Sequence, residues 1–199
     1  AVTLANPTTI DTDAVNNSGD ITIGVVTGSG QNFAMETGNN ITGADITATG
    51  AISNIATFAL DNVGGTATFS GDVDVNALDV DSTVANLALT GNGSTITTTF
   101  TPSNDGTLEL GNATGDTLTF NGGLTTTSVG GTVTLQGTMA TSNDAVVFGA
   151  VTLASATTID TNATNTAGDI IIAAITGGSQ NLTLSTGDNV ANSDITASS

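Results

Sequence analysis

The sequence predicts an all-β fold, a β-solenoid in which short strands stack coil upon coil. Three observations lead to it: the chain repeats itself over a long period, short runs with β-type alternation recur at close spacing, and no segment carries the pattern of a helix. A string of tandem β-sandwich domains is the alternative that strand spacing alone leaves open.

The long repeat is read directly from the sequence. Residues 1–50 align without a gap on residues 150–199, an offset of 149 residues, and 27 of the 50 pairs are identical. We therefore expect residues 1–149 to form one full repeat of a continuous solenoid and residues 150–199 to begin the next copy, with the natural chain continuing past Ser199. If each coil takes roughly 20–30 residues, one repeat corresponds to about five to seven coils.

Short runs of β-forming residues recur about every ten to twelve residues, separated by Gly, Asn, Asp and Ser. Each run alternates, or nearly alternates, as a half-buried strand does. Paired glycines mark several boundaries, at 64–65, 122–123, 130–131 and 177–178, where glycine adopts a positive φ at little cost. The runs expected to be strands are residues 20–23, 67–69, 87–89, 107–110, 117–120, 132–135 and 145–148.

Three features favour a solenoid over sandwiches. The expected strands hold only three to five alternating residues and end in abrupt Gly or Asn turns, which suits the faces of a coil. Asn and Thr are abundant, and identical residues stacked at roughly 4.8 Å can form side-chain ladders. A solenoid also grows by repetition, as this sequence does. Almost no helix is expected, because the chain lacks Lys and Arg, which are strong helix formers that usually occupy the exposed face of a helix.

The charge of the chain excludes several classes of partner. There is no Lys, Arg or His against 18 acidic residues, so the formal net charge is −18 and no side-chain salt bridge can form. A chain without cations cannot neutralise phosphates, which makes nucleic acid and anionic lipid unfavourable partners. The sequence contains no run of eighteen apolar residues, so it predicts no membrane-spanning helix. The absence of cysteine excludes disulfides and thiolate metal sites.

A cassette of about thirty-five residues occurs in both copies. It reads Val-Thr-Leu, Thr-Thr-Ile-Asp-Thr, Gly-Asp-Ile-x-Ile and Gln-Asn-Leu-Thr-Leu, complete from Val151 to Leu184 and present from Val2 to Met35 with Phe33 and Met35 in place of the last leucines. This pattern resembles the repeats of very large bacterial surface proteins of the filamentous-haemagglutinin or adhesin type. The resemblance implies a right-handed parallel β-solenoid in a secreted or surface-anchored fibre, and therefore an extracellular or cell-surface location. The middle third of the chain resembles the cassette only in style.

No catalytic constellation is evident. Without His, Cys, Lys or Arg the chain lacks Ser-His-Asp, thiolate, Schiff-base and guanidinium chemistry. A glycosidase built on two Asp residues is formally possible, but its only support would be the fold, and a fold does not establish a function. We therefore expect no enzymatic activity, and no cofactor beyond a weakly bound Ca²⁺.

The densest acidic segment, residues 72–81, is the candidate metal site. In an extended strand its first two Asp residues share one face, and the same arrangement returns for the last two. Oxygen ligands in this number suit Ca²⁺, although the EF-hand pattern fails at Ala77 and Thr83. We favour a solvated strand face, with any Ca²⁺ bound weakly at the surface. The four candidate ligands are Asp72, Asp74, Asp79 and Asp81.

These features give three hypotheses for function. The first is a structural component of an extracellular filament, stalk or surface fibre, whose partner is another copy of itself, end to end or lateral. The second is an adhesin that binds glycans or surfaces through an exposed Thr, Asn and Asp face. The remote third is an ice-binding solenoid, because outward Thr-x-Thr steps recur, although their irregular spacing argues against one flat array. The six phenylalanines are expected to fill the core and stack between coils: Phe33, Phe58, Phe69, Phe100, Phe120 and Phe148.

Overall fold

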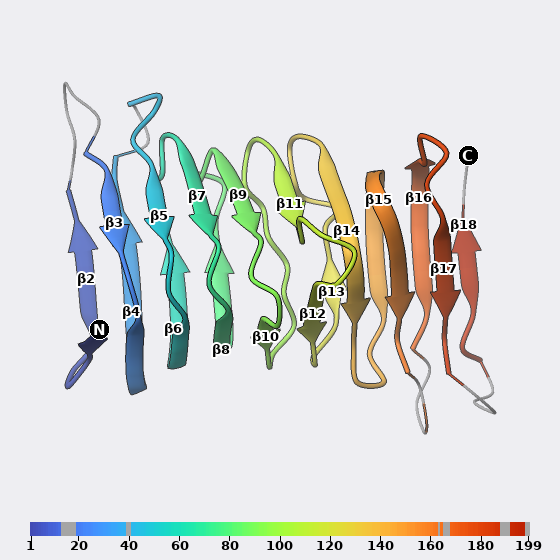
Figure 1. Cartoon of the computed structure of the whole chain (residues 1–199), viewed down its shortest axis with the longest axis horizontal. Helices are drawn as coiled ribbons and strands as arrows, with labels where there is room; N and C mark the ends of the chain where they lie inside the picture. Colours follow the sequence, from blue (N-terminus) through green and yellow to red (C-terminus); the bar gives the residue numbers. More distant parts are fainter. Residues whose placement is uncertain (13–18, 39–40, 163, 165–167, 188–191, 198–199) are drawn as a thin grey trace.

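The computed structural model of the chain describes residues 1–12, 19–38, 41–162, 164, 168–187 and 192–197. This part of the chain contains no helix, and every pair of strands is parallel. The strands stack as a β-solenoid of about 8 turns (Figure 1). The expected parallel β-solenoid is confirmed. The alternative of tandem sandwiches is wrong, because sandwich sheets are antiparallel.

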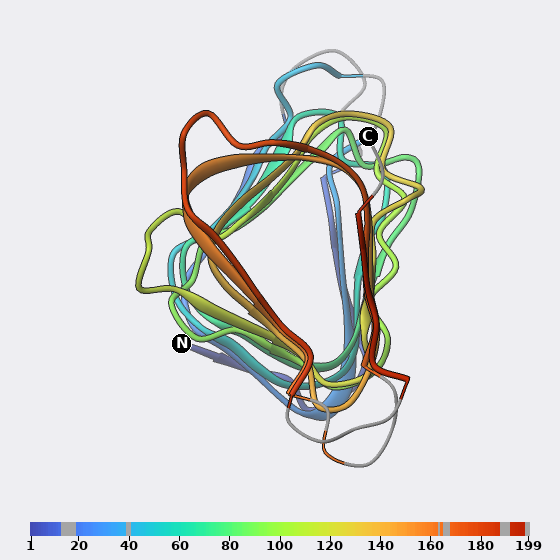
Figure 2. The same cartoon turned by 90° about the vertical axis from the view of Figure 1, so that its right-hand side faces the viewer.

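Three strand positions in each coil form the three faces of a triangular column (Figure 2). Face I contains β1 (Val2–Thr3), the first parts of β4 (Val26–Glu36), β6 (Ile52–Leu60) and β8 (Val73–Val80), then β10 (Thr95–Ile96), β12 (Thr117–Phe120), the last parts of β14 (Val133–Ala140) and β15 (Val146–Asp160), and β17 (Leu182–Ser185). Face II contains β2 (Thr8–Asp11), the last parts of β4, β6 and β8, a bridge at Phe100, β13 (Leu124–Thr125), the first parts of β15 and β16 (Ile170–Thr176), and β18 (Ile195–Ala197). Face III contains β3 (Ile21–Ile23), β5 (Ile46–Ala48), β7 (Thr66–Phe69), β9 (Asn86–Leu89), β11 (Leu108–Leu110), the first part of β14, the middle of β15 and the end of β16.

Several strands are longer than the sequence predicted. In place of three to five residues, β4, β6 and β15 have 11, 9 and 15. The chain turns a corner inside these strands, where the pairing shifts register, as between Thr27 and Gln31 of β4. Positive φ values of 51° at Ser29 and 76° at Gly30 bend the backbone at that corner. Such bulges redirect a strand while its flanking residues stay paired.

The coils differ in length. Val133 pairs with Val151 of the next coil and Val26 pairs with Ile52, so successive coils take between 18 and 26 residues. The expected range of roughly 20–30 residues per coil therefore holds for most coils, and the shortest lies just below it.

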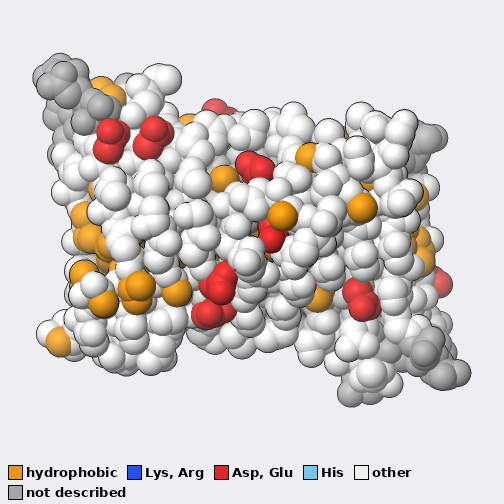
Figure 3. Space-filling model, viewed as in Figure 1, with side chains coloured by type: hydrophobic (Ala, Val, Ile, Leu, Met, Phe, Trp, Pro, Cys, Tyr) orange, Lys and Arg blue, Asp and Glu red, His pale blue; other side chains and the backbone are white. Residues whose placement is uncertain are grey.

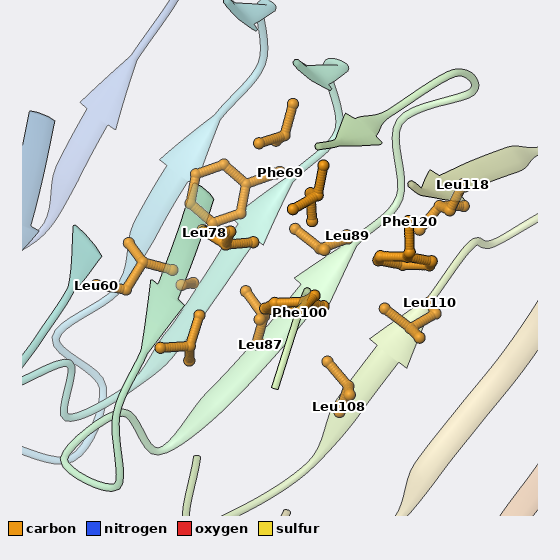
Figure 4. Packing of buried hydrophobic residues seen from close by; sticks show 14 of the residues in the cluster. Leu60, Phe69, Leu78, Leu87, Leu89, Phe100, Leu108, Leu110, Leu118 and Phe120 are labelled. Atoms are coloured by element: carbon orange, nitrogen blue, oxygen red, sulfur yellow. The ribbon is translucent and has the colours of Figure 1, made fainter. Parts of the chain in front are cut away.

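Alternate residues of every face point into the column and form one continuous core (Figure 4). All six phenylalanines are at most 1% exposed, as the sequence predicted. Because parallel pairing places Phe33 directly beside Phe58, their rings stack with centroids 5.4 Å apart, and Phe69 meets Phe58 edge-on at the same separation. Phe100 and Phe120 stack at 5.7 Å. The coils are therefore bonded through both the backbone ladders and the side chains inside them.

Several corner glycines permit close approach of neighbouring coils. A Cβ atom on Gly64 would lie 2.4 Å from the Ile41 carbonyl oxygen, and one on Gly130 would lie 2.2 Å from the Asp105 carbonyl oxygen. Gly123 and Gly178 have positive φ values of 91° and 54°, whereas Gly64 and Gly130 do not have a positive φ. The missing Cβ, more than backbone freedom, therefore selects glycine at the pairs 64–65 and 130–131.

Candidate functional site

The corner where face II ends carries carboxylates on four successive coils, and we term it the acidic corner. Asp11 at the end of β2 pairs with Glu36 at the end of β4. Leu60 pairs with Met35 on one side and Val80 on the other, so the residues that follow them continue the same line. The acidic corner consists of Asp11, Glu36, Asp61 and Asp81.

The carboxyl group of Asp61 is the most perturbed group of this corner. Burial raises its pKa, and the nearby carboxylates of Asp81, Glu36 and Asp79 raise the pKa further. Asn62 Nδ2 donates a hydrogen bond to Glu36 Oε2 over 3.2 Å, which is a neutral substitute for the cation that this sequence lacks. Charge repulsion at this corner therefore opposes the stacking of coils near neutral pH.

The sequence alone does not reveal the acidic corner as a unit. Its members lie 25, 25 and 20 residues apart in the chain, which are the coil lengths at that corner. A search for acidic residues at this spacing would have found it, but the spacing becomes meaningful only once the coil length is known.

The four predicted metal ligands separate into two pairs. Asp72 precedes β8 and Asp74 lies on its first part, on face I, while Asp79 lies on its last part, on face II, and Asp81 follows the strand at the acidic corner. Asp72 Oδ1 accepts a hydrogen bond from Gly93 N (2.9 Å), and Asp81 Oδ1 accepts one from Thr83 N (2.8 Å). Among the described residues no group of three or more carboxylates could hold a metal ion. Weak Ca²⁺ binding at these residues stays a prediction.

A shallow depression of about 300 Å³ lies on face I, lined mainly by polar side chains. The parallel register aligns Ser53, Asp74 and Thr95 on three successive coils. Burial raises the pKa of Asp74, the Asp72 carboxylate raises it further, and hydrogen bonds from Thr95 oppose the shift. Amide, hydroxyl and carboxylate groups together can exchange hydrogen bonds with a polyhydroxylated ligand. The lining residues are Asn54, Ile55, Asp74, Val75, Asn76, Thr95 and Thr97.

A second depression, of about 280 Å³, lies on face II near the N-terminal end. Thr and Asn residues line it together with apolar ones. Neither depression was predicted, because each combines residues of neighbouring coils that are distant in the sequence. The second is lined by Pro7, Thr8, Thr9, Asn32, Phe33, Ala34, Thr57 and Ala59.

Outward threonines form a straight line along face III, which we term the threonine file. Thr22, Thr47 and Thr68 lie on adjacent strands in direct register. Ala88 and Glu109 interrupt the file, and it resumes at residues 134 and 152, both threonine. The irregular sequence spacing of the Thr steps thus does not prevent their alignment, because it follows the unequal lengths of the coils. Ice binding stays the remote alternative, which the interruptions at Ala88 and Glu109 disfavour.

The end coils expose side chains that stand at core positions. Ile195 of β18 is 49% exposed although its partner Ile170 is fully buried, and Val2 of β1 is 47% exposed although its partner Val26 is fully buried. Acidic side chains are dispersed over the side of the column that Figure 3 shows, and no basic residue exists to pair with them.

No family model, curated relative or solved structure matches the chain. Nor does the described part of the chain contain a helix with the length and apolarity that crossing a bilayer requires. The column, its two depressions and its charge are the features that bear on function.

Proposed function

We propose that the chain is a non-catalytic structural element of an extracellular filament, stalk or surface fibre. The observation that carries the proposal is the ladder of face III, which continues without a break from Ile21 through every coil to Ile175. Each coil contacts only its neighbours, so stiffness along the axis adds up coil by coil. Such a column transmits force and holds attached parts at a fixed distance.

The partner that fits the ends of the column is a second copy of the chain. A coil of a parallel solenoid presents strand edges that can pair with the next parallel strand, and burial of one core-position side chain by a further coil stabilises the contact by about 1.5–3 kcal/mol. The net charge of −18 opposes approach, so head-to-tail stacking requires salt that screens it.

Sedimentation velocity combined with negative-stain electron microscopy tests this proposal. Raising the salt from about 0.01 M to about 1 M shortens the Debye length from about 30 Å to about 3 Å, and we expect unbranched rods of constant width to lengthen over that range. Ile195→Asp places a charge in the end contact and should keep the chain monomeric. Ile171→Asp, on the outside of face II where Ile171 is 39% exposed, is the matched control that should still form rods. Monomers at every salt and protein concentration would disprove self-assembly.

A glycan-binding role is the second candidate, and the polar depression on face I supports it. Asn54, Asn76 and Thr97 are exposed there and offer neutral donors and acceptors. The adjacent Asp74 and the absence of any cation disfavour acidic sugars. We therefore expect neutral glycans to bind, and Asn76→Ala to weaken binding about tenfold, the loss of one to two hydrogen bonds. Thr134→Ala on face III is the control, and equal loss in both variants would exclude the depression as the site.

A further inference from the structure

The two copies of the repeat fold in the same way locally. Thr12 Oγ1 donates to the Gly19 carbonyl oxygen and Thr161 Oγ1 donates to the Gly168 carbonyl oxygen, both over 2.5 Å. Asp20 Oδ1 accepts from Asp45 N at 3.1 Å, and its counterpart Asp169 Oδ1 accepts from Asp194 N at 3.0 Å. The corner formed by Ser29 and Gly30 returns as Gly178 and Ser179, again with two positive φ values, of 54° and 71°. The repeat is thus structural as well as sequential.

Equivalent strands of the two copies nevertheless lie on different faces. Val2 pairs with Val26 on face I, but its equivalent, Val151, pairs with Val133 on face III. Ile21 belongs to face III, but its equivalent, Ile170, pairs with Val146 on face II. Thr8 belongs to face II, and its equivalent Thr157 pairs with Gly137 on face I.

The shift follows from the number of strands in one repeat. Val151 stands twenty strand positions after Val2, and each coil has three positions, so 20/3 gives six and two-thirds coils. This lies within the five to seven coils that the sequence predicted. Because twenty is not a multiple of three, every feature of the repeat moves by one face from one copy to the next. Three copies would bring it back to its starting face.

We propose that this repeat is a rotating display, in which any surface that one copy builds is presented one-third of a turn away by the next copy. The wall of the depression on face II illustrates it: Thr9 and Asn32 have as counterparts Thr158 and Asn181, identical in type, on face I. A flat partner that docks along one face meets only one of the two surfaces. The partners that fit are separate ligands arriving from all sides, with neutral hydrogen-bonding groups such as glycan hydroxyls, because the column offers no cation.

Distances between pairs of spin labels on introduced cysteines test the display, because the chain has no native cysteine. The pair Thr22→Cys and Thr152→Cys lies on one file of face III, six ladder steps apart, or about 29 Å at about 4.8 Å per step. The pair Thr22→Cys and Ile171→Cys joins equivalent positions of the two copies, about 32 Å apart along the axis. Because positions 22 and 171 lie on different faces, the distance between them has a component across the column as well as along it. It should therefore exceed the distance from 22 to 152 by more than the axial difference of about 3 Å.

A third pair, Thr9→Cys and Ile171→Cys, joins outward positions of face II about seven coils apart, or about 34 Å along the axis. The rotating display predicts that this distance is shorter than that from position 22 to position 171, although its axial part is longer. If the two copies were aligned on one face, the distance from position 22 to position 171 would be shorter than both the distance from 22 to 152 and the distance from 9 to 171. That result would overturn the inference. The labels sit on outward side chains and the measurement uses dilute monomer, so its outcome is independent of filament formation.

Discussion

Replacement of Phe58 by Ala should remove a large part of the local stability of the column. Phe58 is fully buried, stacks on Phe33 and meets Phe69 edge-on. Truncation of a buried Phe costs about 3–5 kcal/mol, and each aromatic pair contributes about 0.5–1.5 kcal/mol beyond area burial. Two ring contacts place this site near the upper end, at about 4–5 kcal/mol.

Two variants separate the sources of that loss. Phe58→Leu keeps most of the apolar volume and should cost about 1–2 kcal/mol, mainly the ring contacts. Phe148→Ala removes a ring that is 1% exposed but has no ring neighbour among the described residues, so it should cost less than Phe58→Ala by about 1–2 kcal/mol. Urea unfolding followed by circular dichroism gives the free energies.

Hydrogen exchange read by mass spectrometry locates the damage. Because each coil contacts only its neighbours, Phe58→Ala should release protection in its own coil and in those of its partners Phe33 and Leu78, and leave that of β14 and β15 intact. A cost below about 1 kcal/mol, or an equal loss of protection along the whole chain, would refute the nearest-neighbour reasoning.

Four further predictions follow from the corners and surfaces. The raised pKa values of Asp61 and Asp74 mean that the folded chain binds protons at these carboxyl groups more tightly than the unfolded chain does. The stability gained from this proton binding is complete below a pH of about 3.8 and is lost as the pH rises through the raised pKa values. Asp61→Asn should therefore stabilise the chain at pH 7 by up to about 1 kcal/mol and flatten the pH dependence of its melting temperature, and a destabilised variant would contradict this. Gly71→Ala places a Cβ 2.4 Å from the Gly50 carbonyl carbon and should cost at least about 1–3 kcal/mol, whereas Gly24→Ala meets nothing within 4 Å and should be neutral, so equal melting temperatures would argue against close coil approach. Ca²⁺ at ten times a Kd of about 1 mM should stabilise by about 1.4 kcal/mol in a way that EDTA and the Asp72→Asn/Asp74→Asn double variant abolish, and no response to EDTA discards the site. The threonine file is broken at Ala88 and Glu109, so we expect no thermal hysteresis, and hysteresis in a freezing assay would establish ice binding.

The fold class was accessible from the sequence because repetition and alternation are local signals. Inward residues such as Leu108 and Leu110 alternate with outward Glu109, and in the structure both leucines are fully buried while Glu109 is half-buried. The inward stacking of the phenylalanines was accessible for the same reason. What these signals do not contain is the register between coils, which depends on how many residues each corner takes.

Surface features depend on that register, and this is why the sequence did not reveal them. The acidic corner, the threonine file and both depressions join residues about one coil apart, and coils range from 18 to 26 residues. The predicted metal ligands were close in sequence, yet a corner at Asn76 and Ala77 inside β8 turns the pairs onto different faces. The predicted strand lengths were too short for a similar reason, because bulges let a strand such as β15 pass through corners without losing its pairing.

Electron cryomicroscopy of the salt-induced assemblies, at a resolution that separates strands, shows whether one continuous column runs through each fibre. We expect strands perpendicular to the fibre axis, about 4.8 Å apart, in a triangular column that continues across the junction between chains. Strands running along the axis, or compact particles no longer than one chain under every condition, would contradict it.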